Sequence, residues 1–246
     1  MSLPKPYYEE AGITIYHGDC REILPLLPKV DLVLTDPPYA HQHMDGGGFA
    51  AASRFYAGGA LEGLNNFELA GYWNFLRDAA PMMIAFCSRD LIASYCGASE
   101  SSGRKFDLHV WLKTNAIPFT ANTWKSDLEY ICLTWDRKPG WKQLAQHMHS
   151  KAWVSPINSD DSHPAAKPIP LLEKYIKVLD AQTILDPFMG SGTTLVAAKQ
   201  LGRRAIGIEL EEKYCAIAVE RLRQSVMQFD EPAPIEQQGN LLEESS

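Results

Sequence analysis

Two short apolar runs, each ending at an Asp-Pro step, constrain the fold of this chain more than any other feature. The run 31–35 is followed by Asp36-Pro37-Pro38, and the run 183–186 ends in Asp186 and is followed by Pro187. A nearly continuous apolar run of this length is typical of a parallel strand that is buried on both faces. Proline has no N–H to donate to a sheet ladder, so each strand must end at its proline.

The remaining periodic segments alternate between the two types of regular structure. Apolar patterning predicts further strands at 13–17, 82–87, 106–112, 129–135 and 205–209. Helical spacing predicts helices at 67–79, 169–179, 193–201 and 211–225. Strands that alternate with helices favour a mostly parallel sheet with helices on both faces.

Four regions follow from the patterning: 1–135, a weakly periodic insertion at 136–162, an ordered region at 163–225 and a tail at 226–246. The first region contains a Gly/Ala/His-rich loop at 41–65, and loops of that length are typical of functional or mobile segments. The tail contains proline, glutamine and acids but no Lys or Arg, which predicts disorder.

The composition, 46% hydrophobic and 22% charged over 246 residues, is that of an ordinary globular protein. No apolar run approaches the ~18 residues that a membrane span needs, so no membrane partner is expected. The five cysteines are scattered singly without a C-x-x-C pair, which favours reduced thiols and a cytoplasmic location.

The net charge of −7 argues against a nucleic-acid partner, but the charge is unevenly distributed. Removing the five acids of the tail leaves −2, and 103–151 holds eight Lys/Arg against four acids, with four of the six tryptophans. A basic, aromatic segment is compatible with nucleic-acid binding, and a solvated face above core tryptophans is the alternative. If the segment binds DNA, the phosphate contacts are expected from Lys138, Lys142 and Lys151.

The first chemical motif is Asp36-Pro37-Pro38-Tyr39, at the carboxyl end of a predicted strand, where open α/β sheets bind ligands. Two successive prolines hold the backbone rigid. Asp36 and the Pro37 carbonyl can then accept both hydrogens of an exocyclic amine and direct its lone pair toward an electrophile. Tyr39 can stack on a planar base. The alternative is a strand followed by a tight turn without a chemical role.

The second motif is the glycine turn from Asp186 to Thr194, which joins a strand to a helix. Gly190 and Gly192 permit a tight turn and close backbone approach. The turn lacks the G-x-G-x-x-G spacing and the P-loop lysine, so neither a dinucleotide nor a triphosphate is favoured. Glu209 ends the next strand, where an acid can accept from two ribose hydroxyls. The glycine turn and Glu209 together predict a nucleoside-binding site.

Two other kinds of chemistry are not favoured. His147 and His149 have no partners at metal-ligand spacing, so no metal site is predicted. A covalent attack on cytosine C5 would need a Pro-Cys nucleophile, and the chain contains no Pro-Cys dipeptide.

Together these residues resemble the β group of DNA amino-methyltransferases, which methylate adenine N6 or cytosine N4 with S-adenosylmethionine. Asp36, Pro37, Pro38 and Tyr39 resemble its catalytic motif, which precedes the cofactor motif in this permuted group. The segment from His163 to Pro168 is similar to the one that surrounds the methionine part of the cofactor, and Gly18-Asp19 to the one near its adenine. The predicted cofactor-binding residues are Asp19, His163, Lys167, Asp186, Phe188, Gly190, Ser191, Gly192, Thr193 and Glu209.

The resemblance implies a circularly permuted, Rossmann-like methyltransferase fold with a mostly parallel seven-stranded sheet whose last strand is antiparallel. It makes 1–135 the catalytic half, 136–162 a small target-recognition insertion and 163–225 the cofactor-binding half. The two Asp-Pro strands should then be neighbours although ~150 residues separate them.

The implied function is site-specific methyl transfer to a base flipped out of double-stranded DNA, with adenine N6 favoured and cytosine N4 the alternative. An RNA or protein-glutamine methyltransferase fits the permuted order less well, and the intact motifs argue against a non-catalytic nucleic-acid binder. A bacterial cell or a phage-infected host is the expected setting. A homodimer and a cognate restriction nuclease are both compatible with the sequence, which determines neither.

Overall fold

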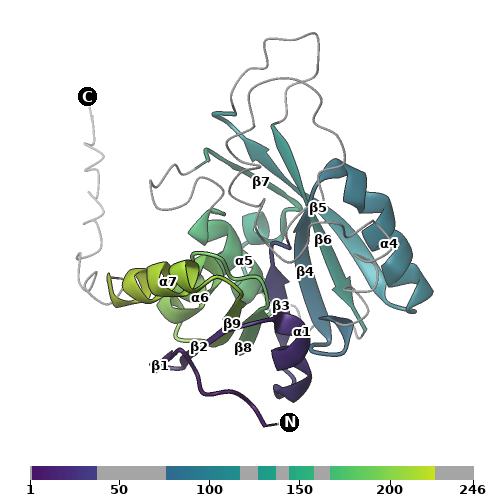
Figure 1. The fold of residues 1–246 in the computed structure, drawn as a ribbon. Coiled ribbons are helices and arrows are strands. Elements are labelled where there is room, and N and C mark those ends of the chain that lie inside the picture. The colour runs from purple at the N-terminus through teal and green to yellow at the C-terminus, as the bar shows by residue number, and fades with distance from the viewer. Residues whose placement is uncertain (1, 38–75, 117–126, 137–143, 158–166, 225–246) are drawn as a thin grey trace, which may run out of the picture.

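The structure is a computed structural model that describes residues 2–37, 76–116, 127–136, 144–157 and 167–224 (Figure 1). Its described strands form one sheet in the order β1-β2-β9-β8-β3-β4-β6-β5-β7. The strands are β1 (Tyr8–Glu10), β2 (Ile13–His17), β3 (Leu32–Thr35), β4 (Met82–Cys87), β5 (Lys105–Lys113), β6 (Leu128–Trp135), β7 (Ala152–Ser155), β8 (Thr183–Asp186) and β9 (Arg204–Glu209).

Helices cover both faces of this sheet. One face packs against α5 (Ile169–Val178), α6 (Thr193–Gln200) and α7 (Glu212–Gln224). The other face packs against α1 (Cys20–Ile23) and α4 (Ile92–Ser101), and against the short 3-10 helices η1 (Leu24–Leu26) and η2 (Arg89–Leu91). Leu32 and Leu34 of β3 point into the first core and Val33 into the second, and all three are 0% exposed. This two-sided burial is why the run in β3 is continuously apolar.

The permuted arrangement predicted from the two Asp-Pro strands is confirmed. Strand β3 pairs in parallel with β8, with Leu32 opposite Ile184, and it pairs in parallel with β4 on its other side. The carboxyl ends of β3 and β8 therefore lie side by side. Among the described strands, the one long antiparallel strand is β6, which pairs antiparallel with both β4 and β5. It is not the last strand of the chain, as was expected, because β7, β8 and β9 follow it.

The described sheet has nine strands, where seven were expected, because a strand is added at each edge. β1 pairs antiparallel with β2. β7 lies within 136–162, which was expected to be irregular, and it pairs in parallel with β5. Helix α4 was also not predicted, since Gly97 and its serines obscure the apolar spacing. The loop 41–65, most of the helix expected at 67–79 and the whole of the tail at 226–246 lie outside the described residues.

None of the helices in the described ranges is long and apolar enough to cross a membrane.

Candidate active site

A buried hydrogen bond joins the two motif strands where they end. Thr35 Oγ1 of β3 donates to Asp186 Oδ1 of β8 at 2.7 Å, and the Phe188 N–H donates to the same oxygen at 3.2 Å. Burial raises the pKa of Asp186 to about 6, against the opposing effect of hydrogen bonds from Thr194 and Thr35. Asp186 thus ties the catalytic-motif strand to the start of the glycine turn.

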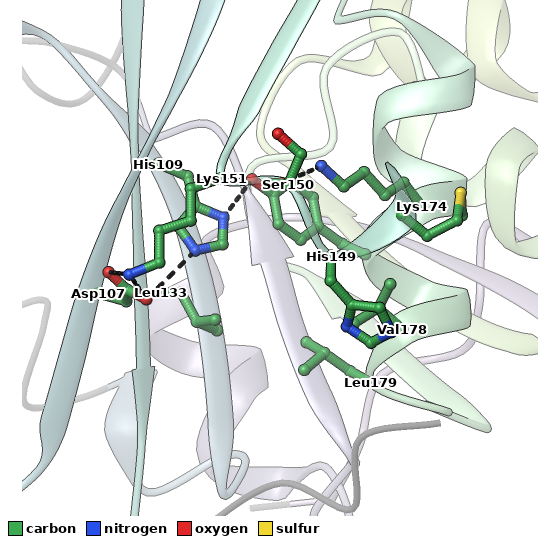
Figure 2. Close-up of a pocket in the computed structure, with 11 residues that line it drawn as sticks. Asp107, His109, Leu133, His149, Ser150, Lys151, Lys174, Val178 and Leu179 are labelled. Atoms are coloured by element: carbon green, nitrogen blue, oxygen red, sulfur yellow. Dashed lines mark hydrogen bonds and ion pairs between the residues drawn. The ribbon is translucent and has the colours of Figure 1, made fainter. Parts of the chain in front are cut away.

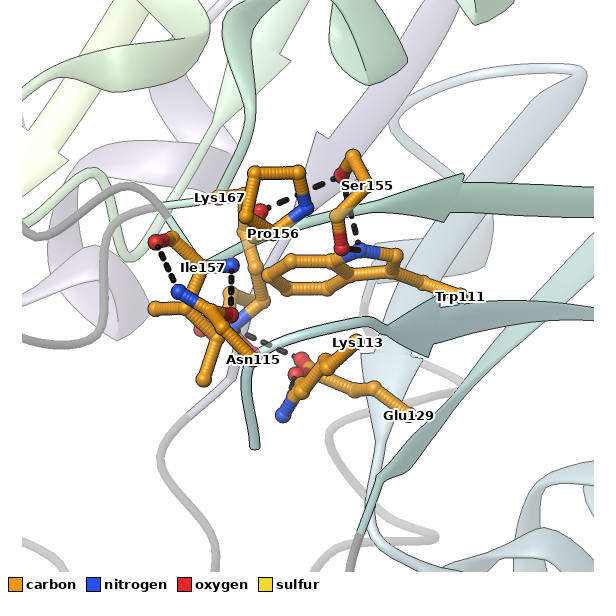
Figure 3. A network of polar contacts seen from close by, with 9 residues as sticks. Trp111, Lys113, Asn115, Glu129, Ser155, Pro156, Ile157 and Lys167 are labelled. Carbon is orange, nitrogen blue, oxygen red and sulfur yellow. Dashed lines mark hydrogen bonds and ion pairs between the residues drawn. The ribbon is translucent and has the colours of Figure 1, made fainter. Parts of the chain in front are cut away.

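Asp36, the first residue after β3, belongs to a line of charged side chains that are between 10% and 29% exposed. Its carboxylate is ion-paired with Lys167, just before α5, and the Lys167 ammonium also lies 2.8 Å from Glu129 Oε1. Glu129 Oε2 in turn lies 2.7 Å from Lys113 Nζ (Figure 3). Pro37 is buried beside Asp36. The other two residues of the motif, Pro38 and Tyr39, lie outside the described residues.

The glycine turn is held from the side of α7. Gly190 and Gly192 have φ values of +50° and +79°, where residues other than glycine are strained. The Arg221 guanidinium donates to the Ser191 carbonyl and hydroxyl oxygens, both at 2.8 Å, and to the Thr193 hydroxyl at 3.0 Å. The hydroxyls of Ser191 and Thr193 are therefore both engaged by α7.

Glu209 closes the other side of the turn. Its Oε2 accepts from the Gly190 N–H at 3.0 Å and its Oε1 from the Glu211 N–H at 2.8 Å. Burial raises the pKa of Glu209, while these backbone hydrogen bonds oppose the rise. Its carbonyl accepts from the Gly18 N–H at 2.9 Å, which brings the next residue, Asp19, to the same edge of the sheet.

These residues fit a nucleoside-bearing cofactor. A Cβ added at Gly190 would meet nothing within 4 Å, so the turn borders open space beside the Glu209 carboxylate. A carboxylate beside an open glycine turn matches the needs of a ribose diol. Asp19 directly follows Gly18 at this edge of the sheet, and its carboxylate caps α1 by accepting from the Arg21 N–H at 2.8 Å. Lys167 lies against Asp36 and Glu129. His163 is outside the described residues.

Sequence reasoning did not find Glu129, Lys113 or Arg221. Glu129 carried the clearest signal, because it is the one acid in the otherwise apolar and aromatic strand β6. Arg221 lies on an amphipathic helix, where a basic residue usually faces solvent.

A cavity of about 230 Å³ lies elsewhere on the sheet, between α5 and β5 (Figure 2). Lys151 pairs there with Asp107 at 2.7 Å, so its positive charge already has a partner. Asp107 lies opposite Leu133, whereas Glu129 lies opposite Trp111, four residues further along β5. That spacing is ~13 Å along a strand, so this cavity is separate from the Asp36 site. Within the described residues, no group of three or more potential metal ligands gathers.

Comparison with known proteins assigns this architecture to a class. The family model described as DNA methylase matches residues 30–220, and the chain belongs to this family.

Its relatives are bacterial methyltransferases. It is 30% identical to the type II methyltransferase M2.DpnII of Streptococcus pneumoniae, over 89% of this chain and 93% of the relative. The solved complex of M1.HpyAVI with S-adenosylmethionine is similar with a TM-score of 0.64 and 28% identity, over 85% of this chain and 98% of that one. The cytosine-N4-specific PvuII DNA methyltransferase, at 18% identity, shares the fold with a TM-score of 0.67, over 88% of each chain.

Proposed function

We propose that this DNA methyltransferase transfers a methyl group from S-adenosylmethionine to adenine N6 of a base flipped out of duplex DNA. The observation that carries the proposal is the placement of Asp36 and the glycine turn on adjacent strands, joined by the Thr35–Asp186 hydrogen bond. An acceptor for an exocyclic amine then lies next to a nucleoside site.

The cofactor half would bind the nucleoside through residues already in place. Glu209 accepts from the ribose hydroxyls, Gly190 lets the backbone approach closely, and Asp19 lies toward the adenine. Bound S-adenosylmethionine supplies a methyl group on a positively charged sulfur. M1.HpyAVI, solved with this cofactor, supports the assignment.

The catalytic half would hold the target amine. An amine inside the duplex cannot be reached, so the base must leave the stack. Asp36 and the Pro37 carbonyl accept its hydrogens and aim its lone pair, and Tyr39 stacks on the ring. The Asp36 carboxylate also offsets the positive charge that develops on nitrogen, so catalysis rests on positioning and electrostatics.

Cytosine N4 is the alternative acceptor. N4 of cytosine and N6 of adenine are both NH₂ groups beside a ring nitrogen, and Asp36 can accept from either. The cytosine-N4-specific PvuII DNA methyltransferase has the same fold.

The test is a methylation assay with isotopically labelled cofactor on genomic DNA, followed by digestion to nucleosides. Labelled N6-methyladenine is the expected product, and labelled N4-methylcytosine would establish the alternative. Label in RNA or protein, with none in DNA, would overturn the proposal. Asp36→Asn is expected to lose turnover while it still binds the cofactor in calorimetry.

We also propose a cytoplasmic role in restriction-modification, because relatives such as M2.DpnII are named type II methyltransferases. Genomic DNA from cells that express the active chain should then resist a nuclease that reads the same site. DNA from cells that express Asp36→Asn should remain sensitive.

A further inference from the structure

A line of four alternating charges begins at Asp36 and continues through Lys167, Glu129 and Lys113. We call these four residues the charged network. The side chains of Lys167 and Glu129 are each only 10% exposed. The Lys167 ammonium also lies 5.2 Å from the centre of the Phe86 ring. The two inner charges are therefore enclosed by protein.

Both inner residues keep their charge because of their neighbours. Burial alone would lower the pKa of Lys167, but the carboxylates of Asp36 and Glu129 outweigh burial and raise it. Burial alone would raise the pKa of Glu129, but Lys167 and Lys113 outweigh burial and lower it. A buried ion pair is rarely more stabilising than apolar side chains of the same size. Fold stability therefore gives little reason for this pair to lie here.

We propose that Lys167 and Glu129 are positioning residues for methyl transfer, with Lys167 fixing the Asp36 carboxylate in the orientation that receives the base amine and Glu129 fixing Lys167. This inference rests on the proposed role of Asp36.

The geometry supports a fixed rather than a mobile Lys167. Its ammonium lies between two carboxylates, and Glu129 is held in the β5–β6 ladder, where it pairs with Trp111. Lys113 holds the other oxygen of Glu129. With one side of its carboxylate anchored, Asp36 does not have to be ordered again when the base arrives, which lowers the barrier to transfer.

The segment after β7 closes this region, as Figure 3 shows. Asn115 Nδ2 donates to the Ile157 carbonyl at 3.1 Å, and the Ile157 N–H donates back to Asn115 Oδ1 at 2.6 Å. Trp111 Nε1 donates to Ser155 Oγ at 3.0 Å. These contacts join β5 and Asn115 to Ser155 and Ile157, at the end of β7 and just after it. The residues around the charged network are therefore held together by hydrogen bonds.

The test compares Lys167→Met with Lys174→Met. Lys167→Met should lower kcat by about tenfold or more, equivalent to ~1.4 kcal/mol, while the dissociation constant for S-adenosylmethionine changes less than ~2-fold. Lys174 is also a buried lysine, on α5, but its ammonium donates to the Ser150 carbonyl, so Lys174→Met should leave kcat unchanged.

Lys167→Arg keeps the charge and should recover part of the lost kcat. Glu129→Gln should lower kcat by a smaller factor than Lys167→Met, because Lys167 loses one of its two carboxylate partners, and it supplies the test if Lys167→Met does not fold. Unfolding curves for each variant establish that equal amounts of folded protein are compared.

The two proposals can fail separately. Full turnover by Asp36→Asn would overturn the role of Asp36 itself. If Asp36→Asn is inactive but Lys167→Met, or Glu129→Gln in its place, keeps the wild-type kcat, the role of Asp36 stands and the positioning role is wrong. Equal losses of kcat in Lys167→Met and Lys174→Met, with no recovery in Lys167→Arg, would show a structural role only.

Discussion

At the scale of single residues, Glu209 combines two tasks. It receives backbone N–H groups of the glycine turn and of the start of α7, and we propose that it receives the ribose hydroxyls of the cofactor. Glu209→Gln keeps the shape but removes the charge. A hydrogen bond to a charged group is worth ~1.5–3 kcal/mol, so cofactor affinity should fall about tenfold or more in calorimetry. Unchanged affinity together with an unchanged unfolding curve would remove Glu209 from the cofactor site.

Asp186 should give the fold a pH dependence. Burial raises its pKa from the usual 3.8 to about 6, so the folded chain binds this proton more tightly than the unfolded chain does. Its contribution to stability is complete below pH ~4 and is lost as the pH rises through ~6, by up to ~3 kcal/mol. The Asp186→Asn variant has no carboxyl group that titrates at this position, so it serves as the reference. The free energy of unfolding of the wild type, measured in urea relative to this variant, should therefore fall between pH 4.5 and 7.5. A constant difference would contradict the raised pKa.

At the scale of elements, the glycine turn and α7 are fitted to each other. Gly192 has a φ of +79°, and a Cβ there would lie 2.7 Å from Ala218 Cβ on α7. Gly192→Ala should therefore lower the free energy of unfolding by ~1–3 kcal/mol through strain and crowding. Gly190→Ala is the control, because its φ is +50° but a Cβ there meets nothing within 4 Å. Equal losses in the two variants would mean that backbone strain alone, and not contact with α7, requires Gly192.

At the scale of the whole molecule, the chain itself has a net charge of −7 and must bind DNA, which is a polyanion. Each phosphate contact that is lost should lower the slope of log affinity against log salt by about 0.9. Lys142→Ala should show this change, but Lys151→Ala should show less, because Asp107 already neutralises Lys151. Deletion of 226–246 should change affinity little, since charges more than ~8–10 Å away are screened at cellular salt. An unchanged slope for Lys142→Ala would place the DNA-binding face elsewhere.

The sequence by itself determined the strands that end at Asp36 and Asp186, the helices that follow the turn, and the family of the chain. These features depend on short-range physics, since apolar period, proline and glycine act on their own neighbours. The tertiary structure alone decided that Lys167 meets Asp36 from 131 residues away, with Glu129 behind it, and that β7 joins the sheet edge. Such pairs form only when the sheet has brought separate strands together, and no local spacing in the sequence records them.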